Sequence, residues 1–199
     1  FSSLPELKQY SNIVINYVPF KYSLLSLELA GSSRDKNRFS TKDEEDNLGY
    51  ARNIVFTLSP IEVSVFNSGI GKIGFSLRER FIQSRFTSIE RFGDVEFNRE
   101  YNVNSSPILS DETLREIRLN YLPIENLNIV STYGYLKKGD SFSSDRVNTY
   151  IDLSSMKDYS LNYNLDYVNS TNPLSSSKWV RQRGKASVSV FSGFGSGLK

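Results

Sequence analysis

The feature that most constrains the fold is a strict alternation of side chains near the C-terminal end of the chain. From Tyr159 to Tyr167 every second residue is tyrosine or leucine, and the residues between them are small and polar. A period of two is typical of a β-strand with one apolar and one wet face. About ten such residues rise roughly 33 Å and, tilted by about 45°, cover roughly 23 Å, close to the apolar band of an outer-membrane barrel. Strands of soluble proteins usually have about five or six residues, so the length favours a membrane strand.

The same alternation recurs along much of the chain. It is found in residues 12–18, 22–30, 50–58, 61–65, 94–104, 114–123, 127–136, 147–153, 159–167 and 178–185. Pro19, Pro60 and Pro123 each follow the end of an alternating run, where the missing proline N–H does least harm to a strand ladder. We therefore predict an all-β fold, an antiparallel meander of about ten to twelve long strands that takes up residues 1–199 as one sheet and forms part of a transmembrane outer-membrane β-barrel.

The connections between these runs are predicted to alternate in length. Turns are expected at the three prolines and at residues 154–158, and longer loops at residues 31–49, 137–146 and 169–177. Outer-membrane barrels have short turns on one side and longer loops on the other. This sorting supports the membrane interpretation.

Composition excludes several classes of protein. Among the 199 residues the mean hydropathy is −0.39 and no run of 18 apolar residues occurs, so helical membrane spans are excluded, whereas strand spans are not. A net charge of +2 gives no reason to expect nucleic acid as a partner. With no cysteine and no histidine, thiol chemistry, histidine-based triads and histidine zinc sites are excluded. We expect no enzyme, and we assign no catalytic, cofactor-binding or metal-binding residue.

Residues 67–93 leave alternatives open. Gly69-Ile-Gly71-Lys-Ile-Gly74 matches the GxGxxG pattern of a dinucleotide site, and Glu90 lies near the ribose-binding distance. Nothing else in the chain indicates the βαβ unit that such a site requires. Helix and strand both fit residues 75–91, and we favour the strand.

Charged residues raise two questions about the predicted strands. Arg99 falls among the apolar positions of the run 94–104, where a charge at the bilayer midplane costs roughly 2–4 kcal/mol, so it must lie near the headgroups or face protein.

Residues 105–113 are expected to form a loop that has room for one helical turn. The basic cluster 178–185 is expected to be a strand with Arg181 and Arg183 in a wet lumen and Trp179 at an interface; the alternative is a partner-binding patch.

Tyrosines gather near the ends of the predicted strands. They are Tyr17, Tyr22, Tyr121, Tyr133, Tyr135, Tyr159 and Tyr167. Their placement favours aromatic girdles at the two bilayer interfaces over the simpler explanation that tyrosine is a good strand former.

Part of the chain resembles a known family. Glu90-Arg-Phe-Gly-Asp-Val-Glu-Phe-Asn-Arg-Glu-Tyr-Asn102 is similar to a stretch of the SprA family, the very large outer-membrane proteins of gliding motility and type IX secretion. The later segments Asn120-Tyr-Leu-Pro-Ile, Lys138-Gly-Asp with Arg146, and Lys178-Trp-Val-Arg181 also look like that family. The resemblance covers about residues 85–190. It implies a giant single-chain barrel that conducts proteins, of which this chain is a slice of the wall, and it carries over no catalytic residue.

The expected function is therefore the wall of a protein-translocation pore in the cell outer membrane. The expected partner is the lipid bilayer, and the resemblance adds a translocated protein and secretion-system subunits. Phe1 and the glycine-rich residues 191–199 suggest a fragment of a larger barrel. The alternatives are a different outer-membrane barrel, for lipopolysaccharide assembly or uptake, and a soluble antiparallel β-sheet binding module.

Overall fold

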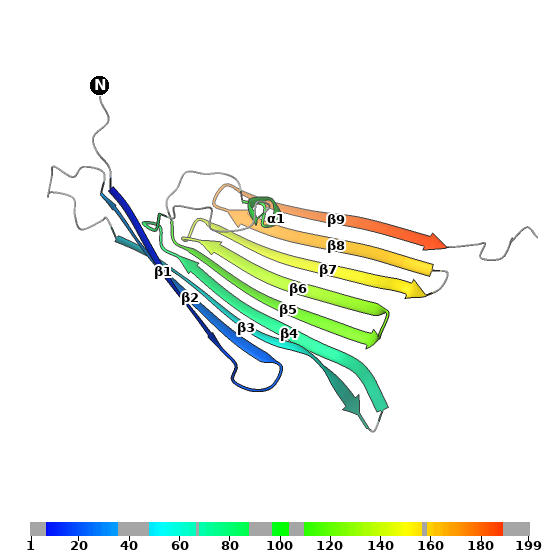
Figure 1. Ribbon diagram of the computed structural model, residues 1–199. Coiled ribbons are helices and arrows are strands. Elements are labelled where there is room, and N and C mark those ends of the chain that lie inside the picture. The colour runs from blue at the N-terminus through cyan, green and yellow to red at the C-terminus, as the bar shows by residue number, and fades with distance from the viewer. Residues whose placement is uncertain are drawn as a thin grey trace, which may run out of the picture.

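The described part of the chain is almost entirely β-structure. The computed structural model describes residues 7–35, 48–66, 68–87, 97–103, 110–156 and 159–188. They form nine strands and one short helix, which Figure 1 shows in chain order. The elements are β1 Leu7–Tyr17, β2 Ser23–Asp35, β3 Leu48–Val65, β4 Ser68–Ile82, α1 Phe97–Glu100, β5 Glu112–Ile124, β6 Leu127–Lys138, β7 Phe142–Met156, β8 Tyr159–Asn172 and β9 Ser175–Val188.

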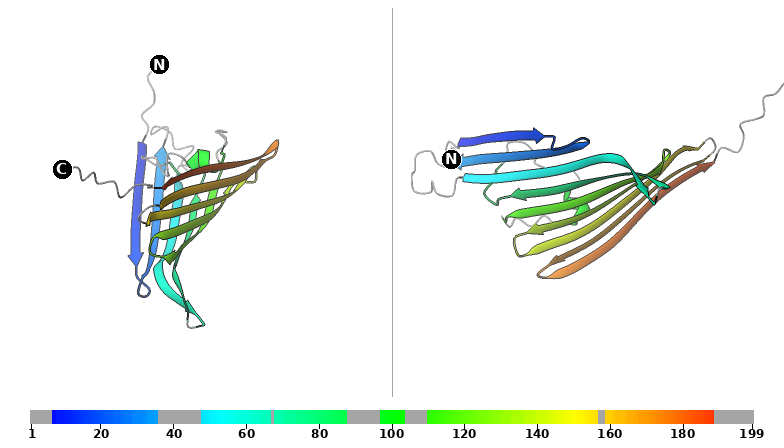
Figure 2. Two further views of the ribbon diagram at one scale, coloured as in Figure 1. Left: turned by 90° about the vertical axis from the view of Figure 1, so that its right-hand side faces the viewer. Right: turned by 90° about the horizontal axis from the view of Figure 1, so that it is seen from below.

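All nine strands lie in one antiparallel sheet in the order of the sequence. This confirms the predicted meander, although nine strands are seen in the described residues and ten to twelve were expected. In this part of the chain β1 pairs only with β2, and β9 only with β8, so the sheet is open and does not close into a barrel. Figure 2 shows that β1 and β9 run in clearly different directions, as the right-handed twist of successive strands requires.

The strands are long, from 11 residues in β1 to 18 in β3. The predicted break at Pro60 is wrong, because β3 continues through this proline. The pairing with β4 instead shifts between Leu58 and Ile61, which leaves Pro60 in a bulge where its missing N–H costs no ladder hydrogen bond. Predicted runs 50–58 and 61–65 are therefore one strand.

The prediction of a strand over residues 94–104 is wrong where the structure describes it. Residues 97–100 form α1, and residues 101–103 continue as turn and irregular backbone. The alternation misled because Phe97 and Tyr101 are also four apart, the spacing of one helical face. Residues 94–96, 104 and most of the predicted loop 105–113 lie outside the described residues, and β5 already begins at Glu112.

The preference for strand over residues 75–91 is confirmed as far as Ile82. Residues 83–87 are turn and irregular backbone instead, and residue 67 and residues 88–93 lie outside the described part. The GxGxxG segment 69–74 is inside β4. It lacks the loop before a helix N-terminus that a dinucleotide site needs.

The long loops predicted at 137–146 and 169–177 are wrong. β6 and β7 are joined by residues 139–141, where Gly139 has a φ of 53°, and β8 and β9 by residues 173–174. At the second turn the Asn172 side-chain oxygen accepts the backbone N–H of Leu174 and Ser175, at 3.0 and 2.8 Å, so a tight turn forms in a segment that is merely polar. Among the connections between the nine strands, only those after β2 and β4 are long. Both lie at the same end of the sheet, which agrees with the prediction that long loops lie on one side and short turns on the other.

Candidate functional site

The register divides the side chains of the sheet into two faces of opposite character. One face, which we call the apolar face, carries aliphatic and aromatic residues in the middle of successive strands. They include Ile15, Leu27, Ile54, Phe56, Phe75, Leu77, Ile117, Leu119, Ile129, Val147, Ile151, Leu161 and Leu165. The opposite face, the polar face, carries Asn, Ser, Thr, Arg and Glu at most positions, and this division follows from the period-two alternation of the sequence.

The apolar face is uncovered in the described part of the chain. Ile117 and Leu119 in the central strand β5 are 54% and 47% exposed, and no element packs over them. The polar face is instead the covered one, because the described residues 83–87 and 97–103 of the β4–β5 connection pack on it. The Thr87 N–H donates to the Ser32 hydroxyl at 2.9 Å, and the Phe86 ring meets the Tyr10 ring at 6.1 Å. This arrangement reverses that of a soluble sandwich, in which apolar faces pack on each other.

A charged row borders the apolar face toward the end of the sheet with the long connections. Glu79 in β4 pairs with Arg52 at 2.8 Å and with Arg115 at 3.3 Å. The register continues this row through Tyr135, Asp145, Asn169 and Lys178 across β6 to β9. From β4 to β9 apolar side chains thus give way to charged or polar ones along this row, whereas in β3, β2 and β1 the same row holds Ile54, Leu27 and Ile15.

The tyrosines predicted to form girdles lie in two groups. Tyr17, Tyr22, Tyr121 and Tyr159 lie at the end of the sheet with the short turns. Tyr135 lies in the charged row and Tyr133 and Tyr167 lie beside it, and the Tyr133 hydroxyl donates to Asp145 at 2.7 Å. Each group lies at a border between apolar side chains and polar ones, and such a border suits the amphipathic ring of tyrosine.

The polar face holds a network of ion pairs between neighbouring strands. Arg80 and Lys138 both contact Glu112, at 2.6 and 2.9 Å. Arg78 contacts Glu116 at 3.4 Å. Arg146 bridges two elements, with 3.0 Å to Glu100 of α1 and 3.1 Å to Asp166 of β8. The cations of β4, β6 and β7 in this network thus have carboxylate partners.

Tyr101, directly after α1, fixes the connection to this network. Its hydroxyl donates to Glu116 at 2.7 Å, and its side chain is 1% exposed between Leu114 and Leu136. Gly134 opposite Glu116 makes room for the ring, because a Cβ there would collide with the Tyr101 hydroxyl.

The Arg80 guanidinium lies over the neighbouring Phe97 ring at 4.3 Å. The conflict foreseen for Arg99 disappears, because Arg99 lies in α1 and not among the residues of the apolar face.

The environment of Tyr101 predicts a specific loss of stability at high pH. Burial, and then the negative charge and hydrogen bond of Glu116, raise the pKa of this phenol well above its usual value. A tyrosine in the unfolded chain ionises near pH 10, so Tyr101 contributes stability below that pH and loses it as the pH rises further. We expect the free energy of unfolding to fall above about pH 10 by up to about 1.4 kcal/mol per pH unit more than in Tyr101→Phe, measured by denaturant titration in detergent. Parallel curves for the two proteins would contradict this.

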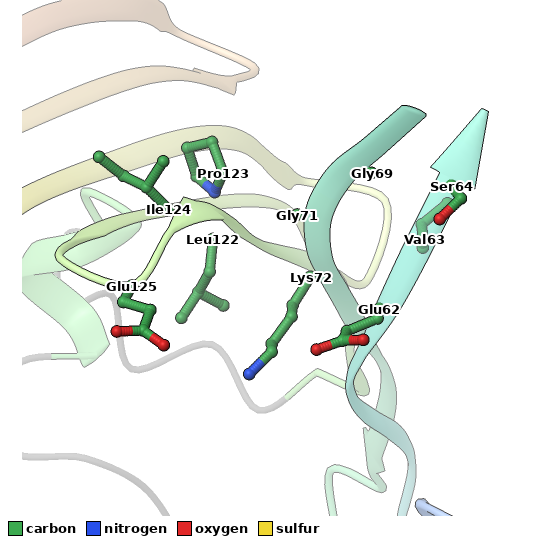
Figure 3. A pocket seen from close by; sticks show the side chains of 10 residues that line it. All are labelled: Glu62, Val63, Ser64, Gly69, Gly71, Lys72, Leu122, Pro123, Ile124 and Glu125. Atoms are coloured by element: carbon green, nitrogen blue, oxygen red, sulfur yellow. The ribbon is translucent and has the colours of Figure 1, made fainter. Parts of the chain in front are cut away.

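At the short-turn end, the β3–β4 hairpin and the β5–β6 turn enclose an open hollow of about 410 Å³ (Figure 3). The side chains of Glu62, Lys72 and Glu125 extend to the same side of it. Gly71, with a φ of 103°, lies so close to Leu122 and Pro123 that no Cβ fits there. The register shift between Val63 and Ser64 of the same hairpin lies at the edge of this hollow.

The basic segment 178–185 lies within β9, so the predicted strand is confirmed. Trp179, Arg181, Arg183 and Lys185 all lie on the polar face, and the Arg181 guanidinium lies 5.1 Å from the Trp179 ring centre. The α1 segment lies across from them and lines the same hollows. Sequence reasoning missed the α1 segment as a partner of this strand. The sequence signal that could have revealed it is the conflict of Arg99 with a lipid-facing strand.

Comparisons with protein-family models, curated proteins and solved structures yielded no match to this chain. In the described residues no group of three or more His, Cys, Asp or Glu side chains is placed to hold a metal ion. The described helix is too short to cross a membrane.

Proposed function

We propose that this chain forms part of the wall of an outer-membrane β-barrel, with its apolar face toward lipid and its polar face toward water. One observation carries the proposal: in the described residues the apolar face is bare, while Thr87 and Tyr101 of the β4–β5 connection pack on the polar face. Large exposed apolar surfaces mark contacts with a membrane or another protein. A face made of long neighbouring strands, bordered by charged and polar residues on β4 to β9, suits a bilayer.

The dimensions of the apolar face support the same orientation. In β8 the alternation of tyrosine and leucine extends from Tyr159 to Tyr167, and Asn169 then joins the charged row. This stretch covers roughly 20 Å when a strand is tilted by about 45°, near the apolar height of known barrels. Arg52, Glu79 and Arg115 would then lie at the headgroup level, where paired charges stay hydrated.

The resemblance to the SprA family narrows the proposal from a barrel wall to a protein-translocation pore linked to gliding motility and type IX secretion. The segments that carry it include β9 with Lys178-Trp-Val-Arg181 and the residues around α1. A wide pore for polypeptides needs a polar lining, and the ion-paired polar face supplies one.

The test of the barrel wall is how the full chain partitions between water and membrane. We expect the refolded protein to need detergent for solubility, and to stay with lipid vesicles through flotation and an alkaline wash. Far-ultraviolet circular dichroism should show β-structure in the vesicles. A chain that is folded, monomeric and stable in plain buffer would contradict the proposal and favour the soluble module.

A further inference from the structure

Three cations of the polar face that have no carboxylate partner among the described residues lie together on β9, whereas Lys72 of β4 and Arg118 of β5, which also have none there, lie on other strands. Arg78, Arg80, Lys138 and Arg146 each contact a glutamate or aspartate. Arg181, Arg183 and Lys185 follow at alternate positions of β9, and in the described part of the chain none forms an ion pair. Asp166, beside Arg181, is already held by Arg146 and by Asn148 at 2.7 Å. Residues 189–199, which follow β9, contain no aspartate or glutamate.

These cations line a groove between the α1 segment and strands β8 and β9, which we call the β9 groove. Two adjoining hollows of about 390 and 500 Å³ make it up, and Arg99 of α1 and Arg181 line both. The first hollow continues along Arg183 and Lys185, and the second ends at Trp179.

Neutral donors add to the positive charge of the groove. Asn162 and Asn164 line it from β8. The side-chain oxygen of Asn162 accepts the Tyr150 hydroxyl at 3.0 Å, and that of Asn164 accepts the Asn148 amide at 3.3 Å. Both oxygens are thus occupied within the sheet, and the two amide nitrogens remain available as donors in the described structure. A site with several cations and free N–H groups suits a ligand with several oxyanions.

We propose that the β9 groove binds an extended acidic polypeptide segment with carboxylates at alternate residues. Arg181, Arg183 and Lys185 repeat every two residues, a spacing of about 6.6 Å along a strand. An extended peptide has the same period, so every second side chain of such a segment meets one cation of β9. The two guanidinium groups fit carboxylates in a bidentate manner, and Trp179 offers an apolar contact at one end. The proposal deepens the function proposed above, since it names the class of cargo segment that the wet face contacts.

The test uses the full chain in detergent and a fluorescent peptide of alternating aspartate and serine, with binding followed by anisotropy. The variant Arg183→Gln/Lys185→Gln removes two exposed cations of the groove. The matched control Arg118→Gln/Lys72→Gln also removes one arginine and one lysine from the polar face, outside the groove. We expect the groove variant to bind about tenfold more weakly and the control to change by about twofold or less. Arg183→Lys should retain most of the binding, which shows that a folded strand with the charge kept is sufficient.

Several results would overturn the inference. Equal losses in the two double variants would show attraction by the whole polar face, with no site at β9. A single-stranded oligonucleotide or inorganic triphosphate that displaces the peptide at equal charge concentration would assign the groove to phosphates. Because binding is measured in detergent, it is separable from the membrane test: a chain that enters vesicles and ignores the peptide refutes only the groove, and a chain that binds the peptide and stays water-soluble refutes only the barrel wall.

Discussion

Replacement of Leu119 by arginine is expected to abolish stable insertion of the chain into lipid vesicles. Leu119 lies in the central strand β5, in the middle of the apolar face and 47% exposed. A guanidinium near the bilayer midplane costs roughly 2–4 kcal/mol on the lipid face of a barrel. The measurement is the fraction of protein that floats with vesicles after an alkaline wash, compared with the unchanged chain.

The matched control is Asn120→Arg, one residue further along the same strand. Asn120 lies on the polar face, between Gly74 and Val130, so the same charge there lies on the opposite side of the sheet from the apolar face. Arg118 already places a guanidinium on that face. We expect flotation of the control to change little. Equal effects of the two substitutions would show that β5 does not present one face to lipid, and would contradict the proposed orientation.

Replacement of Tyr101 by alanine is expected to detach the segment 97–103 from the polar face. The substitution removes a buried ring that packs against Leu114 and Leu136, a loss of about 3–5 kcal/mol for large aromatic side chains. It also removes the 2.7 Å hydrogen bond to Glu116. The expected result is faster protease cleavage between residues 83 and 111, with the sheet itself retained, as measured by mass spectrometry of the fragments and by circular dichroism.

Two further variants separate the causes of that effect. Tyr101→Phe keeps the ring and loses only the hydrogen bond, so cleavage should rise much less than in the alanine variant, in line with about 1–3 kcal/mol for an unsatisfied partner. Tyr163→Ala removes a partly exposed tyrosine from β8 on the apolar face and should leave the cleavage rate of residues 83–111 unchanged. An alanine variant at position 101 that resists protease as well as the unchanged chain would show that other contacts hold the segment.

The alternation of side chains was sufficient to predict the topology of the sheet and the faces of most strands. Leu161, Tyr163 and Leu165 share a face as expected, because a strand allows no other arrangement of alternate residues. The lengths of the connections were harder to predict. Polar residues such as Ser143, Ser170 and Ser177 were expected in loops and instead continue the strands, because short polar side chains fit the wet end of a strand as well as a loop.

The α1 segment could not be predicted from local pattern. Phe97, Arg99 and Tyr101 fit a strand and a helical turn equally, and the choice depends on partners that lie far away in the sequence. The Tyr101 hydroxyl donates to Glu116 and its ring packs against Gly134, and Glu100 forms an ion pair with Arg146. Likewise, the sequence placed Arg181 and Arg183 on the wet side of a strand, but only the structure shows that α1 closes a groove over them.

The open margins of the sheet have a consequence for how it is stabilised. Along the outer sides of β1 and β9, the described residues leave a row of backbone N–H and C=O groups without a ladder partner. Hydrocarbon cannot hydrate such groups, and each one left bare there costs several kcal/mol. If the apolar face is immersed in lipid, both margins therefore require adjoining strands, and the immersed sheet is stable only as one sector of a continuous ring of hydrogen bonds.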